Sequence, residues 1–178
     1  MKCEGLLTMR QFDLKQLSPR ELLSLFGQVL EQLRKREVVR SGNNPVADYC
    51  ESLVVRALRL TREPGSNKGF DARDSGGKYY EIKGRRITKH NPSTQLSVCR
   101  ELDAHQFDYL VGVLFDSEFD VTRACCVPWE VVKQCATHRE YVHGWIMHLT
   151  PSVWEQDGVR DITAELRKAQ NDWTYVES

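Results

Sequence analysis

Two acids and a lysine in the stretch from 69 to 86 are the residues of this chain best suited to chemistry. The stretch reads GFDARDSGGKYYEIKGRR and contains Asp71, Glu81 and Lys83. Carboxylate oxygens are ligands that Mg²⁺ prefers, and this ion usually keeps several waters and takes only one or two protein carboxylates. An ammonium group beside such a metal can hold an attacking water or balance charge on a transferred phosphoryl group. These residue types therefore point to hydrolysis of a phosphate ester.

The elements that must position these groups are two short strands over 70–74 and 78–84, joined by a turn at Ser75-Gly76-Gly77. A three-residue loop whose last glycine is left-handed is typical of a hairpin, and its pairing places Asp71 opposite Glu81. A two-residue Gly-Gly loop would shift the pairing by one residue and separate the two acids. The alternative is a solvated hairpin face with alternating charges and no chemistry.

The hairpin resembles the catalytic motif of the PD-(D/E)XK superfamily, the restriction-endonuclease-like nucleases. Asp71 matches the first acid, and Glu81-Ile82-Lys83 matches the second acid, the hydrophobic spacer and the lysine. The proline of the superfamily's name is absent, since Gly69-Phe70 precede Asp71. The resemblance implies that Asp71, Glu81 and the Ile82 carbonyl bind Mg²⁺ or Mn²⁺. It also implies that Lys83 orients or activates water.

The helix expected over residues 45–60 carries Glu51 on or beside its apolar face. A carboxylate in that place is costly unless it is paired or bound to a metal. In the superfamily, the helix before the catalytic hairpin often supplies an additional acid, and the resemblance places that acid at Glu51. The alternative is a boundary glutamate in a salt bridge with an arginine. The patterns NNP-x-x-D-Y-x-E, S-x-K-G-F/Y-D-A and K-x-R-R resemble a group of uncharacterised bacterial proteins within this superfamily.

Basic residues lie on both sides of the hairpin acids in the sequence. Lys68 precedes the first acid, and Arg85, Arg86 and Lys89 follow the lysine. Because the net charge of the chain is zero, contact with a nucleic acid must come from such local clustering. We expect these four side chains to contact DNA phosphates. If they diverge in space, they are instead a solvated charge run.

The rest of the sequence predicts an α/β fold. The residues Ser18-Pro19-Arg20-Glu21 predict a capped N-terminal helix that runs to about Glu37, and the apolar run 107–115 predicts a strand covered on both faces. Further strands are expected over 119–127 and 145–149, and further helices over 128–135 and 162–170. This order agrees with a restriction-endonuclease-like core, a central mixed β-sheet flanked by helices, with an extra N-terminal helix. We expect one domain over 1–178, with an N-terminal helical extension over 1–40, a nuclease-like core over 45–135, and a C-terminal strand and helix over 136–178.

The composition predicts a globular cytoplasmic protein. The chain has 178 residues, of which 40% are hydrophobic and 28% charged, which is enough to bury a core. No apolar run is long enough to span a bilayer and no signal peptide opens the chain, so no membrane partner is expected. The six cysteines show neither a C-x-x-C pair nor zinc-site spacing, which is typical of reduced cysteines. A thiol enzyme is a further alternative.

Two functional hypotheses follow from these patterns. The first is a Mg²⁺-dependent endonuclease that hydrolyses DNA phosphodiester bonds, alone, as a homodimer or with a partner subunit. The second is a catalytically inactive DNA-binding or protein-interaction module with a nuclease-like fold, because a fold does not fix a function. The sequence leaves open the choice between DNA and RNA and the specificity of recognition.

Overall fold

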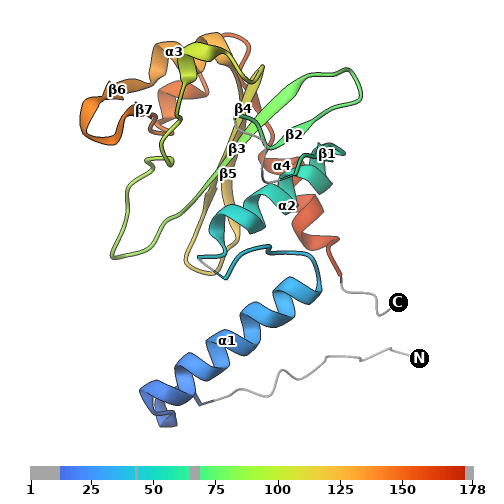
Figure 1. Cartoon of the computed structure of the whole chain (residues 1–178), viewed down its shortest axis with the longest axis vertical. Coiled ribbons are helices and arrows are strands. Elements are labelled where there is room, and N and C mark those ends of the chain that lie inside the picture. The colour runs from blue at the N-terminus through green and yellow to red at the C-terminus, as the bar shows by residue number, and fades with distance from the viewer. Residues whose placement is uncertain (1–12, 43, 65–68, 175–178) are drawn as a thin grey trace.

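The structure is a computed structural model that describes residues 13–42, 44–64 and 69–174. The described residues form a six-stranded mixed sheet, a two-stranded ribbon and four α-helices (Figure 1). The helices are α1 (Pro19–Lys35), α2 (Val46–Leu58), α3 (Trp129–Cys135) and α4 (Thr163–Asn171). The strands are β1 (Thr61–Arg62), β2 (Ala72–Arg73), β3 (Tyr79–Arg86), β4 (Tyr109–Phe115), β5 (Val121–Pro128), β6 (Thr137–Arg139), β7 (Gly144–Ile146) and β8 (Arg160–Asp161). Short 3-10 helices lie at Leu14–Gln16, Leu102–Ala104, Glu140–Val142 and Pro151–Val153.

The main sheet has the strand order β1-β2-β3-β4-β5-β8. Strands β3 and β4 are parallel, and the other neighbouring pairs are antiparallel. The β3–β4 ladder is long and runs from the pair Tyr80–Tyr109 to the pair Arg86–Phe115. The mixed α/β sheet expected from the sequence is therefore confirmed. Strand β3, which carries the candidate acid Glu81 and Lys83, forms one of the two longest ladders of this sheet, and β4 takes part in both.

Two apolar layers cover the two faces of this sheet. On one face, α2 and α4 contribute Leu53 and Leu166, which pack in one cluster with Val111. On the other face, Leu110 packs in a second cluster with Met147, in a layer to which α3 also contributes. Successive residues of β4 therefore enter opposite layers, and both layers bury them, as the near-continuous apolar run predicts.

Helix α2 lies unusually close to β3. A Cβ atom added at Gly84 would be 2.7 Å from the Cβ of Cys50, so the glycine makes room for the helix. This close approach brings the next residue of α2, Glu51, toward the strand that carries the other acids. No helix in the described part of the chain is long and apolar enough to cross a membrane.

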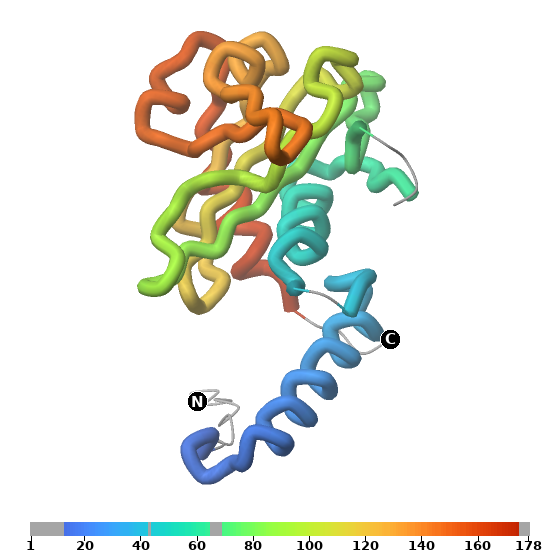
Figure 2. The backbone as a smooth tube through the Cα atoms, turned by 60° about the vertical axis from the view of Figure 1, so that its left-hand side comes forward, coloured from blue at the N-terminus to red at the C-terminus, as the bar shows by residue number. Residues whose placement is uncertain are grey.

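Helix α1 begins with the predicted capping box and projects away from the sheet (Figures 1 and 2). The backbone N–H of Ser18 donates to Glu21 Oε2 at 2.8 Å, and the N–H of Glu21 donates to Ser18 Oγ at 3.4 Å. Of the residues of α1, Leu30 alone is buried. The apolar stripe of this helix therefore faces outward along much of its length.

Several element boundaries differ from those expected from the sequence. The strand expected over 145–149 is the shorter β7, which pairs with β6 rather than with the main sheet. The sequence did not indicate β6, because its three residues are all exposed and have no apolar alternation. The connection after α2 contains the edge strand β1, and β8 adds a two-residue strand before α4. Near the C-terminal end of the described residues, Trp173 stacks on Tyr49 with centroids 6.0 Å apart.

Candidate active site

The turn between β2 and β3 has the three-residue form that the glycines predict. Gly77 adopts a φ of +81°, in the left-handed region that favours glycine. Asp74 organises the turn, since its Oδ1 accepts hydrogen bonds from the N–H groups of Gly76 at 2.8 Å and Lys78 at 2.9 Å. The alternative two-residue turn, which would have shifted the pairing, is not formed.

The resulting register brings the two hairpin acids together. Ala72 pairs with Tyr80, which is the last pair of this ladder, and Asp71 directly precedes Ala72. The N–H of Asp71 donates to the carbonyl of Tyr80 at 2.8 Å, so Asp71 and Ala72 both face Tyr80, as in a β-bulge, and the regular pairing ends here. Asp71 Oδ2 then accepts a hydrogen bond from the N–H of Ile82 at 2.7 Å. The carboxylate of Asp71 thus accepts the hydrogen bond from Ile82 that the carbonyl of a neighbouring strand would otherwise accept.

Beyond Tyr80, this edge of β3 has no strand partner among the described residues. The N–H and C=O of one residue point to the same side of a strand. Because the N–H of Ile82 points to Asp71, the carbonyl of Ile82 points to the same edge. The Asp71 carboxylate and the Ile82 carbonyl therefore face one space, as the predicted ligand set requires.

Lys83 lies next to Glu81 on the same face of β3. Its Nζ is 2.7 Å from Glu81 Oε1, and its side chain is only 9% exposed. Burial by itself lowers the pKa of Lys83, but the attraction of Glu81 and Asp71 outweighs this effect and raises the pKa above its ordinary value. At neutral pH the side chain is therefore an ammonium ion, which donates hydrogen bonds and does not accept a proton.

Asp71 carries the most perturbed carboxyl group of the site. Burial, followed by the negative charges of Glu81 and Glu51, raises the pKa of Asp71 to about 7. The hydrogen bond from Ile82 and the charge of Lys83 act in the opposite direction but are outweighed. Burial and, to a smaller extent, repulsion from the other two acids therefore favour retention of a proton on Asp71. A cation bound among them would relieve the same repulsion.

Glu51 forms the salt bridge that the sequence leaves open, and it lies near the hairpin acids. Its charge contributes to the raised pKa of Asp71, so it lies near the hairpin acids. It also forms a salt bridge with Arg40, and its Oε2 is 3.9 Å from Nε of Arg62. The Glu51 side chain is 13% exposed, and burial raises its pKa despite both arginines. Glu51 is thus an acid beside the site that is already paired within the protein.

The segment that carries Arg40 is fastened to α2 by several hydrogen bonds. Asp48 Oδ2 accepts from the N–H groups of Arg40 at 2.9 Å and Ser41 at 2.8 Å. Ser52 Oγ donates to the carbonyl of Val38 at 2.8 Å. Ser52 Oγ also accepts a bond of 2.7 Å from Arg62. These bonds hold both arginines over Glu51, a feature that the sequence analysis missed because it joins three separate segments.

The basic residues after the lysine do not form one patch. Arg85 donates from Nε to the carbonyl of Ser93 at 3.0 Å and from its terminal nitrogen to Asn91 at 2.6 Å. Arg86 instead binds the carbonyl of Ser117 and lies over the ring of Phe119 at 4.4 Å. Adjacent residues of a strand point to opposite faces, which explains the divergence.

The other two predicted phosphate contacts also differ in what the structure shows. Lys89 is exposed and lies in the turn that joins Thr88 to Asn91, so it shares a loop with the partner of Arg85. Lys68 lies outside the described residues. Of the four expected basic contacts, Arg85 and Lys89 are therefore the two that the structure places near each other.

A metal bound here would have few side-chain ligands. No group of three or more His, Cys, Asp or Glu side chains is arranged to hold a metal within residues 13–42, 44–64 and 69–174. Two carboxylates and a carbonyl form a smaller donor set, which suits Mg²⁺ because that ion keeps several waters. Cys50 and Cys99 are buried near these acids, and burial raises the pKa of Cys99 to about 11 and that of Cys50 well above its usual range. Neither thiol is therefore poised as a nucleophile.

Comparison with known proteins adds no relative. No protein-family model matches this chain, and no curated protein matches its sequence. The class that the fold and the site define is therefore a mixed α/β protein with two acids and a lysine at the edge of a sheet.

Proposed function

We propose that the protein is a metal-dependent nuclease that hydrolyses DNA phosphodiester bonds at the β2–β3 edge, on a restriction-endonuclease-like core. The observation that carries the proposal is the cluster at the end of the β2–β3 ladder, because Asp71 Oδ2 accepts from the N–H of Ile82, the residue between Glu81 and Lys83, and Lys83 Nζ is 2.7 Å from Glu81 Oε1. A structural hairpin has no need of a buried cluster of acids, since unpaired buried charge is costly. A hydrolase that binds a cation and a phosphate has such a need.

The donor set fits a hard divalent cation. Asp71, Glu81 and the carbonyl of Ile82 would hold Mg²⁺ or Mn²⁺, and repulsion among the acids is what a cation would neutralise. When bound, the metal supplies a Lewis acid for the phosphoryl oxygen and lowers the pKa of a bound water. Lys83 contributes a fixed positive charge that donates a hydrogen bond to the attacking water or to a phosphate oxygen.

Glu51 and the basic loop have secondary roles in this proposal. Glu51 lies where an additional acid would bind a second metal or a metal-bound water, after its salt bridge with Arg40 opens. Arg85 and Lys89 form the side from which DNA phosphates are contacted. Arg86 is assigned to folding, because it lies on the face of β3 opposite to Lys83 and Arg85, where its guanidinium contacts Ser117 and Phe119.

The test is cleavage of plasmid and oligonucleotide DNA with Mg²⁺ or Mn²⁺. Asp71→Asn keeps an oxygen for the N–H of Ile82 but removes the charge, and Lys83→Met removes the ammonium while filling the same volume. Both variants are expected to lose cleavage by at least about 100-fold, the loss usual for a group that stabilises developing charge. Lys78→Met is the matched control, since Lys78 lies on the same hairpin but pairs with Asp108 at the surface. Equal cleavage by all four proteins, or by none of them, would reject the proposal.

A second candidate is a DNA-binding or protein-interaction module without catalysis. The observation that favours it is the internal pairing of the acids: Glu81 with Lys83, and Glu51 with Arg40. Thermal stability with and without Mn²⁺ separates the two candidates. Stabilisation of the wild type that is absent in Asp71→Asn supports the nuclease. DNA binding that Mn²⁺ leaves unchanged supports the module.

A further inference from the structure

The apolar face of α1 is exposed over the half of the helix nearest its N-terminus. Leu22, Leu23, Phe26 and Val29 are 39%, 70%, 52% and 48% exposed. A single exposed leucine needs no explanation, but residues three and four apart lie side by side on a helix. These four residues therefore form one continuous apolar surface, the α1 stripe, of the kind that marks a site of association.

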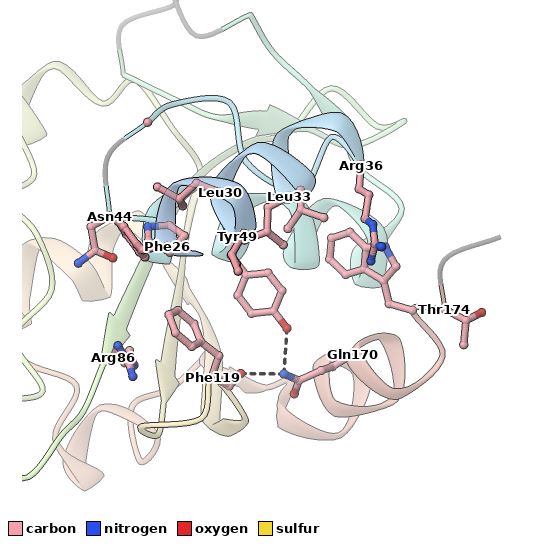
Figure 3. Close-up of a pocket in the computed structure, with 15 residues that line it drawn as sticks. Phe26, Leu30, Leu33, Arg36, Asn44, Tyr49, Arg86, Phe119, Gln170 and Thr174 are labelled. Carbon is pink, nitrogen blue, oxygen red and sulfur yellow. Dashed lines mark hydrogen bonds between the residues drawn. The ribbon is translucent and has the colours of Figure 1, made fainter. Parts of the chain in front are cut away.

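A groove lies beside the same helix, and Phe26 and Val29 of the α1 stripe line it too. Its volume is about 1070 Å³. Its other apolar walls are Leu30 and Leu33 of α1 and the aromatic rings of Tyr49, Phe119 and Trp173 of the body. Figure 3 shows how side chains from α1, α2 and the C-terminal region meet around this space. The polar groups between its aromatic walls are paired with each other, because the side-chain amide of Gln170 donates to Tyr49 Oη at 2.9 Å and to the carbonyl of Phe119 at 2.7 Å. The groove therefore suits an apolar occupant.

We propose that the occupant is the α1 stripe of a second copy of this chain, so that the protein is a two-fold symmetric dimer. In an antiparallel pair of α1 helices, Leu22 lies opposite Leu33 of the partner subunit and Phe26 lies opposite Val29 of the partner subunit. This one arrangement places the exposed half of each helix over the groove of the other copy. A surface that is complementary to itself in this way is what a two-fold interface requires.

Charge also favours the antiparallel arrangement. Helix α1 carries Glu21 in its first turn and Arg34 and Lys35 in its last turn. The same register sets Glu21 opposite Arg34 of the partner subunit and aligns the two helix dipoles favourably. A parallel pair would place the basic ends together and the two glutamates together. Between these ends, the helix residues that face each other in this register are uncharged, whereas Arg36 and Arg86 also line the groove.

The groove is needed because the helix alone is too small an interface. A helix of 17 residues is about 25 Å long and about 10 Å wide, a strip of roughly 250 Å² in projection. A stable interface buries about 800 Å² on each partner. The aromatic walls of the two grooves supply the additional contact. A dimer held by α1 against α1 alone is therefore not the expected form.

Sedimentation equilibrium of the full chain tests the dimer. The wild type is expected to sediment at twice the chain mass of 20.6 kDa across the micromolar range. The double variant Leu22→Glu and Phe26→Glu is expected to halve this mass, because it would bury charge in the groove. Ser24→Glu with Gln28→Glu is the matched control, since these exposed residues lie on the other side of α1, and it is expected to remain a dimer.

Disulfide trapping tests the orientation. In a background of Cys3→Ser and Cys135→Ser, the variants Leu22→Cys and Leu33→Cys are expected to form a covalent dimer when mixed and oxidised. Neither variant alone is expected to do so, because residues 11 apart on a helix are separated by about 16 Å. Cross-linking of Leu22→Cys with itself would show a parallel pair and overturn the proposed arrangement.

Two outcomes would overturn the dimer itself. A wild type that sediments at 20.6 kDa at every concentration would mean that a second copy does not bind the groove. If the chain then dimerised after removal of residues 1–12, that segment would be the occupant of its own groove. Neither result depends on the nuclease proposal, because Glu51, Asp71, Glu81 and Lys83 do not line the groove. The two proposals can therefore fail separately.

Discussion

Replacing Asp71 by asparagine should make the metal-free protein more stable than the wild type at neutral and mildly alkaline pH. The pKa of Asp71 is about 7 in the folded protein, against an ordinary value of 3.8. A carboxyl group with a raised pKa stabilises the fold fully below its ordinary pKa, and this contribution is lost as the pH rises through the folded-state pKa. Asparagine does not titrate, and its oxygen can still accept the hydrogen bond from Ile82. The Asp71→Asn variant therefore does not lose this contribution to folding stability as the pH rises.

The size of the effect follows from the size of the pKa shift. A rise of about 3 units at about 1.4 kcal/mol per unit corresponds to a stability difference on the order of 4 kcal/mol. The difference should be near zero at about pH 4, grow through pH 5 and 6, and level off above about pH 7. Comparison of the two proteins at each pH cancels the titration of the acids that they share.

Urea unfolding in the presence of a chelator measures this difference from about pH 4 to about pH 8. Asp120→Asn, the same change at an exposed carboxylate away from the site, is the control. Adding Mn²⁺ should then stabilise the wild type and leave Asp71→Asn unaffected. A stability difference that stays constant across the pH range would refute the reasoning, because it would mean that burial and the neighbouring acids do not raise the pKa of Asp71 in the fold.

Three further predictions concern the turn and the arginines. Gly77→Ala should cost about 1 kcal/mol in urea unfolding because of the positive φ of Gly77, and more than Gly76→Ala, whose backbone is not left-handed. Arg40→Ala should cost about 1 kcal/mol at neutral pH by removing the partner of Glu51, and the same change in a Glu51→Gln background should cost little in a double-mutant cycle. Arg86→Ala should lower stability but leave the salt dependence of DNA binding unchanged, because this side chain faces the body and not the basic loop.

The hairpin could be predicted from the sequence because its geometry is decided locally. The glycine after two turn residues selects the three-residue loop, and the two-residue period of a strand then fixes which side chains face each other. Asp71 and Glu81 are ten positions apart in the sequence, yet one turn decides whether they meet. The N-terminal helix was predictable for the same reason, since its capping box at Ser18 is a local feature.

The surroundings of the acids could not be predicted, because they come from distant segments. Arg40 lies between two helices, and Arg62 lies on a two-residue strand, so neither belongs to a pattern with a period. Their pairing with Glu51 depends on how the segment around residue 40 is fastened to α2. The divergence of Arg85 and Arg86 is different in kind. The two-residue period of a strand implies that Arg85 and Arg86 point to opposite faces. The expected basic cluster instead grouped them because they are neighbours in the sequence.

The segment that carries Arg40 links the two proposals physically. It joins α1, whose apolar stripe we assign to a second copy, to α2, which presents Glu51 to the hairpin acids. A displacement of α1 would therefore act next to the Arg40–Glu51 salt bridge. In the nuclease proposal, this salt bridge must open before Glu51 can bind a metal. If pairing of the α1 helices shifts this segment, dimer formation should change the affinity of the protein for Mn²⁺. The double variant Leu22→Glu and Phe26→Glu should then alter this affinity, although it changes no residue of the site. Equal Mn²⁺ affinity in monomer and dimer would show that Asp48 and Ser52 hold the segment rigidly against α2.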